Sequence, residues 1–207
     1  MNLSRRNVCV FHGQKGFSLL ELLIVMVLVI VGFTVYFGGG SRSFQSKAIA
    51  ECSKNLDTMF IALKTYSTDN NGKFPALAGA ATSEPVLSLL IPRSTTGTAC
   101  FICPGSKDKS LPEAKPFADR KISYAYYMGL TSADGADRAL VSDRQVNTNS
   151  KTAGQPLFSL DGKGPGNNHN KYGGNIMFCD GSVRLSPALA AFGLTNAPGV
   201  ILLNPVP

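Results

Sequence analysis

Residues 17–37 read FSLLELLIVMVLVIVGFTVYF, and this apolar stretch decides how the N-terminal part of the chain folds. As an α-helix it is roughly 30 Å long, at about 1.5 Å per residue, which is enough to cross the hydrocarbon core of a bilayer. Its only charged residue is Glu21, and Arg5, Arg6 and Lys15 precede it. Basic residues tend to stay on the cytoplasmic side. We therefore expect a single membrane span, with the N-terminus in the cytoplasm and the rest of the chain exported.

The residues around this stretch are ordered differently from those of an ordinary secretory signal. Such a signal has its small-residue cleavage site after the apolar run, whereas here the small residue, Gly16, comes before the run. Residues 16–21, GFSLLE, resemble the class III signal of type IV prepilins and type II secretion pseudopilins. The resemblance implies that a prepilin peptidase cuts after Gly16 and methylates the new N-terminus at Phe17. The alternative is a plain signal anchor.

Glu21 is costly in a membrane unless it has a partner. An ionised carboxylate in hydrocarbon costs at least about 2.5 kcal/mol, and cleavage after Gly16 creates a positive amine on Phe17. In the family that the segment resembles, this acid pairs with the N-terminal amine of a neighbouring subunit. The resemblance therefore implies that Glu21 directs assembly. It also implies other pilin or pseudopilin subunits, the inner membrane, and a secretion or pilus assembly machinery as partners.

The whole sequence predicts an α+β, pilin-like fold. We expect a long N-terminal helix, with a transmembrane half and an amphipathic half, packed on a small antiparallel β-sheet domain with long loops. The expected boundaries are a cleaved leader over 1–16, the transmembrane helix over 17–37, its amphipathic continuation over 38–67, and a periplasmic globular domain over 68–207. The amphipathic half is indicated by apolar residues at three- and four-residue steps: Phe44, Ala48, Cys52, Leu56, Phe60 and Leu63.

Short strands are expected in the C-terminal part of the chain. Five segments have a strand-like composition: residues 122–128, 139–142, 176–179, 182–185 and 200–203. Asp180-Gly181 lies between two of them and is a strong signal for a two-residue hairpin turn. Ser186, Pro187 and Gly193 have the spacing of caps at the two ends of a short helix.

The charge balance argues against nucleic acid as a partner. The formal net charge is +7, and Arg5, Arg6 and Lys15 supply three of these charges, so loss of the leader would leave +4. No run of Lys and Arg interleaves with aromatic residues. The sequence also shows no catalytic Ser/His/Asp motif and no phosphate-binding loop. We therefore expect neither an enzyme nor a bound cofactor.

Four cysteines follow the leader, and their pairing is open. Cys9 lies in the leader, while Cys52, Cys100, Cys103 and Cys179 lie in the part expected to be exported. An even number of cysteines suits an oxidising compartment, where disulfides persist. Cys100 and Cys103 also have the spacing of a redox or zinc motif. The alternatives are a disulfide among the four, a zinc site that includes Cys179 and His169, or free buried thiols.

A second group of polar residues lies toward the C-terminus. His169 precedes Asp180-Gly181 with ten residues between them. This resembles the signature of a pilin-like family abundant in planctomycetes, in which nine residues separate the histidine from Asp-Gly. Asp143, His169 and Asp180 are candidates for a metal or ligand site. The other interpretation is that Asp180-Gly181 only forms a hairpin turn and that His169 hydrogen-bonds a loop.

Three functions are compatible with these features. The first is a structural subunit of a type II secretion-like pseudopilus or a type IV pilus. The second is a minor pilin-like binding protein whose C-terminal domain captures a polymer, DNA or a surface ligand. The third is a monomeric anchored periplasmic domain.

Overall fold

The computed structural model describes residues 18–38, 40–147 and 150–207, and the chain divides into two compact units, Met1–Ser41 and Arg42–Pro207. The first unit contains helix α1 (Leu19–Gly38). Apolar side chains project on all sides of α1, and among its residues 19–36 even the least exposed large apolar residue, Ile24, is 49% exposed. A helix that is apolar all round needs an apolar environment. In the described part of the chain, α1 is also the helix that is long and apolar enough to cross a membrane.

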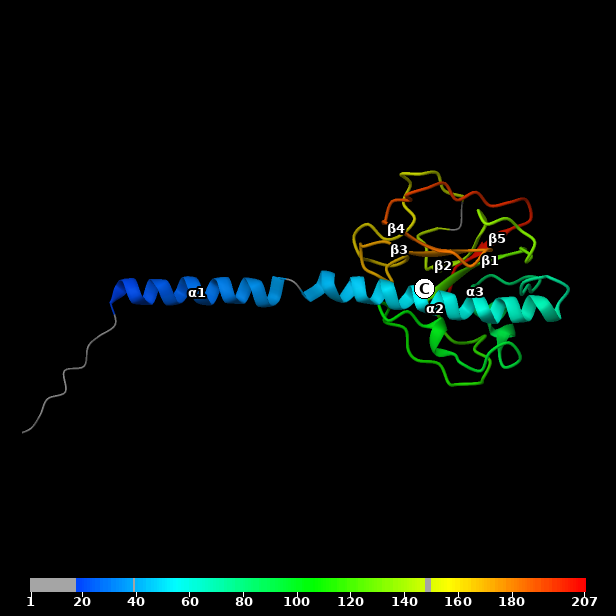
Figure 1. The fold of residues 1–207 in the computed structure, drawn as a ribbon, viewed down its shortest axis with the longest axis horizontal. Coiled ribbons are helices and arrows are strands. Elements are labelled where there is room, and N and C mark those ends of the chain that lie inside the picture. The colour runs from blue at the N-terminus through cyan, green and yellow to red at the C-terminus, as the bar shows by residue number, and fades with distance from the viewer. Residues whose placement is uncertain (1–17, 39, 148–149) are drawn as a thin grey trace, which may run out of the picture. The chain divides into compact units, whose positions relative to one another are not determined.

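The second unit is built on helix α2 (Gly40–Asp69) and a five-stranded antiparallel sheet (Figure 1). The strand order is β4-β3-β2-β1-β5. The strands are β1 (Tyr124–Met128), β2 (Ala139–Asp143), β3 (Gly174–Phe178), β4 (Val183–Ser186) and β5 (Ile201–Leu203). An apolar N-terminal helix followed by a helix and an antiparallel sheet confirms the predicted α+β, pilin-like fold class.

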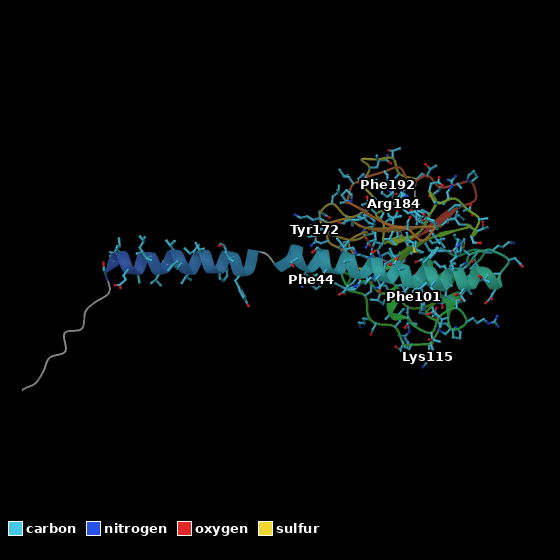
Figure 2. All side chains as sticks on the ribbon, viewed as in Figure 1. Phe44, Phe101, Lys115, Tyr172, Arg184 and Phe192 are labelled. Atoms are coloured by element: carbon cyan, nitrogen blue, oxygen red, sulfur yellow. A yellow bond between two sulfur atoms is a disulfide. The ribbon has the colours of Figure 1, made fainter. Side chains whose placement is uncertain are left out.

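Helix α2 packs along the sheet through a face that only partly matches the predicted one. Cys52, Leu56 and Leu63 are fully buried, as is Met59, which the prediction omitted. Phe44 was predicted on the same face but is 58% exposed, and Figure 2 shows it near the start of α2. The reason is geometric: each four-residue step advances about 40° around a helix. A long series of such steps therefore leaves the buried face.

The turn after α2 begins the return of the chain to the sheet. Asn71 has φ 54° and Gly72 has φ 80°, and the Gly72 N–H donates to the Ser67 carbonyl at 2.7 Å. Left-handed backbone at a helix end is a common way to stop the helix, and it favours Gly and Asn. The short helices α3 (Ser83–Leu87), η1 (Ser88–Leu90) and η2 (Ala99–Phe101) follow.

The central strands are buried on both faces. All residues of β2 and β3 are buried, and in β1 only Met128 is partly exposed. A sheet with one face in water would show alternating burial instead, which these three strands lack. Long loops account for the difference, because Leu157 and Phe158 are buried and their N–H groups donate to the Ala188 carbonyl at 2.9 and 3.0 Å. These loops cover strand surface that would otherwise face water.

The predicted hairpin is present, but the predicted helix after it is not. Asp180 Oδ1 accepts hydrogen bonds from Ser182 N and Ser182 Oγ at 2.9 and 2.7 Å, and Gly181 adopts φ 87°. The residues from Pro187 to Gly193 instead form an irregular segment with an isolated bridge between Leu189 and Pro156. Backbone pairing with the loop before β3 satisfies groups that a helix would have paired internally.

Candidate functional site

The N-terminal segment has its acid in the first turn of α1. Gly16 and Phe17 lie outside the described residues, so the cleavage and methylation site stays a prediction. Glu21 is exposed and stands in the first turn, where a negative charge interacts favourably with the helix dipole. Among residues 18–38, 40–147 and 150–207, no cation forms an ion pair with Glu21. Its partner would have to come from the N-terminus or from another molecule.

A disulfide lies at the centre of the second unit. Cys52 of α2 is bonded to Cys103, which follows η2, and their Cα atoms are 5.5 Å apart. Cys100 and Cys179 are buried free thiols. The spacing of Cys100 and Cys103 was compatible with a direct pair, but the Cys100 Sγ donates instead to the Gly97 carbonyl at 3.6 Å. The cross-link therefore joins α2 to a loop that comes 51 residues later in the chain.

His169 and Asp143 lie directly against this disulfide. His169 Nε2 is 3.4 Å from Cys103 Sγ and 3.2 Å from Asp143 Oδ2. The four side chains of Cys52, Cys103, Asp143 and His169 each offer one ligand atom, and these atoms all lie within 4.8 Å of one another. All four residues are at most 1% exposed. We call this group the buried Cys-His-Asp cluster.

Asp143 is held by three nitrogen donors. It is the last residue of β2, and its Oδ2 accepts a hydrogen bond from the Asn175 N–H at 2.7 Å. Its Oδ1 accepts from Asn168 Nδ2 at 2.9 Å, and His169 Nε2 is the third donor. Gly174 allows this approach of β3, because a Cβ there would lie 2.9 Å from both the Asp143 Cβ and the Phe158 ring. The carboxylate is thus oriented by backbone as well as by side chains.

Gly105 brings a backbone donor to the sulfur of Cys103. The Gly105 N–H donates to Cys103 Sγ at 3.3 Å. A Cβ at position 105 would lie 2.6 Å from His169 Nδ1 and 2.5 Å from the Asn168 carbonyl oxygen, so a larger residue would push the histidine away. Within the described residues, His169 Nδ1 is buried and has no hydrogen-bond partner.

Asp180 is separated from the other two predicted ligands. It lies in the β3–β4 turn beyond Phe178, whereas Asp143 contacts the start of β3 at Asn175. Hydrogen bonds from Ser182 lower the pKa of the Asp180 carboxyl. The structure thus brings Asp143 and His169 together and uses Asp180 in the turn. Sequence reasoning missed Cys52: the zinc alternative grouped Cys100, Cys103 and Cys179 with His169, and no local spacing pointed to Cys52.

An open polar pocket of about 510 Å³ lies next to the buried cluster. It shares Gly105 and Asn168 with the surroundings of the cluster, and Lys107, Lys121 and Arg144 also line it. Arg144 Nη2 is 3.1 Å from Asp108 Oδ2, which neutralises part of the positive charge. In the described part of the chain, Arg144 Nε and Asn168 Oδ1 are buried without a partner. The residues that line the pocket therefore include both hydrogen-bond donors and acceptors.

The free thiols should be unreactive in the folded protein. Burial raises the pKa of Cys100 to about 11 and that of Cys179 to about 12, from a usual value of 9.0. The thiolate is the reactive form. A thiol pKa raised by two units or more therefore slows alkylation at pH 8 by at least about a hundredfold relative to the unfolded chain. We expect iodoacetamide to label both residues only in denaturant, as counted by peptide mass. Equal labelling of Cys52 and Cys103 in oxidised protein would contradict the observed pairing.

The same pKa values predict a loss of stability in alkali. Above pH 9 the unfolded chain loses thiol protons that the folded chain keeps, and stability falls with pH wherever the unfolded state binds fewer protons. The contribution of these buried thiols to the free energy of unfolding is present in full below pH 9, and it is lost as the pH rises toward 11 for Cys100 and toward 12 for Cys179. The midpoint of denaturant unfolding should therefore decrease between pH 9 and 11, and a constant midpoint would contradict burial of these thiols.

Comparison with known protein families gives a match in the N-terminal segment. The prokaryotic N-terminal methylation motif matches residues 11–37, which include the end of the basic segment, Gly16, Phe17, Glu21 and nearly all of α1. No curated protein and no solved structure shows significant similarity to the chain. The resemblance of the segment from His169 to Gly181 to the planctomycete-type family stays a prediction.

Proposed function

We propose that the protein is a structural subunit of a type II secretion-like pseudopilus or of a type IV pilus, assembled through α1. The N-terminal methylation motif supports a type IV pilin-like or pseudopilin subunit that is processed by prepilin peptidase, and it implies assembly with other pilin subunits. Proteins with this motif have structural roles. The single observation that carries the proposal is the coincidence of this motif with an apolar helix that has an acid in its first turn.

The proposed topology follows from the same segment. α1 lies in the inner membrane before assembly, the residues before it are cytoplasmic, and the second unit is periplasmic. In the fibre, the exposed apolar surface of α1 packs against α1 of other subunits. Such packing removes the apolar side chains from lipid without exposing them to water. The direct test is whether the protein is recovered in sheared fibres or stays in the inner membrane.

Processing is tested by the change Gly16→Val. Gly16 has no side chain, so the peptide can approach a peptidase at the membrane surface closely. The variant should accumulate as a longer, unmethylated precursor, whereas the wild type should begin with methylated Phe17. Intact-mass measurement distinguishes the two. The control is Gly32→Val within α1, where a Cβ has no heavy atom within 4 Å, and its cleavage should be normal. Normal processing of the Gly16 variant would refute the site.

The polar pocket supports a second candidate function. A minor subunit whose C-terminal domain captures a polymer, DNA or a surface ligand needs a recessed polar site, and small-ligand sites usually combine a concave shape with a few convergent polar groups. Lys107, Arg144 and Asn168 are polar residues that line the pocket. Salt-sensitive retention of DNA by the purified protein would favour this role over a purely structural one.

A further inference from the structure

The buried Cys-His-Asp cluster contains the ligand types of a zinc site. We propose that, in the thiol form in which the chain is synthesised, Cys52, Cys103, Asp143 and His169 bind one Zn²⁺. The Cys52–Cys103 disulfide is the oxidised, metal-free form of the same site. This inference concerns the second unit and does not depend on the proposed role in a fibre.

The donor atoms and their spacing select zinc. Two thiolates, one imidazole and one carboxylate form a four-ligand set of the kind that Zn²⁺ binds tetrahedrally, with about 2.3 Å to sulfur and about 2.0–2.2 Å to nitrogen and oxygen. In such a tetrahedron a nitrogen and an oxygen ligand lie about 3.3 Å apart, and a sulfur and a nitrogen about 3.6 Å apart. The observed distances are 3.2 Å for His169 Nε2 to Asp143 Oδ2 and 3.4 Å for His169 Nε2 to Cys103 Sγ.

The surroundings of the ligands also fit a metal site. Ligating carboxylates and thiolates are usually held by further hydrogen bonds. Asn168 and the Asn175 N–H hold Asp143, and the Gly105 N–H points at Cys103 Sγ. An N–H donor stabilises a thiolate more than a disulfide sulfur, because a charged acceptor makes the stronger bond. A site made of two thiolates, one carboxylate and Zn²⁺ has one net negative charge. These N–H donors partly offset that charge.

Asp143 gives an independent reason for a cation. A buried carboxylate normally has a positive partner. The neighbouring Arg144 is committed to Asp108, and in the described part of the chain the one ion-pair partner of Asp143 is His169. Zn²⁺ would neutralise Asp143 together with the two thiolates. A hydrolytic Cys-His-Asp site is less suitable, because the same nitrogen, Nε2, faces both Asp143 and Cys103 and because the cluster is closed to substrate.

The proposed chemistry balances without a cofactor. Binding of Zn²⁺ by the two thiols and the neutral imidazole releases two protons from sulfur. A disulfide oxidant can then remove two electrons from the zinc-bound sulfurs. The Cys52–Cys103 bond forms, the oxidant's disulfide takes up these electrons with two protons from solvent and becomes two thiols, and Zn²⁺ leaves. Both forms link α2, the loop after η2, the end of β2 and the loop before β3. In the exported domain, zinc would thus hold these four segments together until the two cysteines are oxidised.

The test compares the two redox forms of one protein. The full-length chain in detergent is unfolded with denaturant and a dithiol reductant, refolded without oxygen with added ZnCl₂, and freed of excess metal. The disulfide form receives the same treatment without reductant. We expect one zinc per chain in the thiol form and none in the disulfide form, with a higher Tm on zinc addition only for the thiol form. Co²⁺ in place of zinc should give thiolate-to-cobalt charge-transfer absorption.

Matched variants assign the ligands. Cys103→Ser and His169→Gln should abolish stoichiometric zinc binding, and Asn168→Ala, which loosens Asp143, should weaken the affinity about 10- to 100-fold. The double variant Cys100→Ser/Cys179→Ser and the variant Asp180→Asn should bind one zinc, because these residues lie outside the cluster. Circular dichroism reports folding of each variant.

Three results would overturn the proposal. The first is a thiol-form wild type that binds no more zinc than the disulfide form, or that fails to fold with zinc present. The second is loss of the cobalt absorption in the Cys100/Cys179 double variant. The third is unchanged zinc affinity in a folded Asn168→Ala or His169→Gln variant.

Discussion

Replacing Glu21 by Ala should leave cleavage after Gly16 intact and lower subunit association by about two to three powers of ten. The variant helix is more apolar and still inserts, so the peptidase meets the same substrate. In the proposed assembly, however, the amine of the incoming Phe17 loses its partner in a low-dielectric surrounding. Leaving one charge of a buried pair unpaired costs roughly 3–5 kcal/mol, and each 1.4 kcal/mol corresponds to about tenfold in association.

The experiment confirms the mature N-terminus by mass and then quantifies sheared fibres and subunit cross-links. Glu51→Ala is the control, since Glu51 is an exposed acid on α2, outside the anchor, and its loss should leave assembly near the wild-type level. A fully processed Glu21→Ala variant that assembles as the wild type does would refute the pairing. The proposed fibre role would then lose its mechanism, and a simple membrane anchor would be favoured.

Removing the disulfide with Cys52→Ala/Cys103→Ala should lower the free energy of unfolding of the second unit by about 4 kcal/mol. This is in addition to the effect of losing two buried sulfurs. The two residues are 51 apart in the sequence. In the chain-entropy model, a cross-link closing a loop of about 50 residues stabilises the fold by about 4 kcal/mol, because it restricts the unfolded chain. The loss is a large part of the stability of a typical domain.

The matched control is Cys100→Ala/Cys179→Ala, which removes two buried sulfurs without cutting a cross-link. Each of these changes should cost about 1 kcal/mol, the scale of one buried methylene-sized group. Denaturant unfolding in detergent, followed by circular dichroism and with a chelator in every sample, gives the difference between the two double variants. The chelator removes any metal that the remaining side chains of the cluster, Asp143 and His169, would bind. Equal stability of the two double variants would show that the cross-link does not stabilise the fold.

The sheet could be predicted where local chemistry alone defines a turn or a strand. Asp180-Gly181 forms the predicted hairpin turn because Gly181 takes a positive φ and Asp180 accepts hydrogen bonds from Ser182. The helix predicted from Pro187 to Gly193 does not form, because here a distant segment competes with the local signals. Its cap signals were present, but pairing with the loop before β3 satisfied the backbone instead. Local signals hold only where no distant segment competes for the same hydrogen bonds.

The buried cluster could be predicted from the sequence only in part. Asp143 and His169 were candidates from the sequence, and Asp180 was grouped with them because it follows a familiar spacing from His169. The structure uses Asp180 in a turn and supplies Cys52 and Cys103 to the cluster instead. No spacing along the chain encodes a contact between residues 52, 103, 143 and 169, because four separate elements bring them together.

The sequence by itself determined the predictions for the N-terminal segment. The apolar run, its single acid and the glycine before it are contiguous, and their chemistry depends on a bilayer and a peptidase rather than on the rest of the fold. Only the tertiary structure decided which cysteines pair and what surrounds them. The physical reason is that disulfide and metal sites need side chains within a few ångströms of one another. In the second unit, the packing of α2 and the loops against the sheet sets those distances.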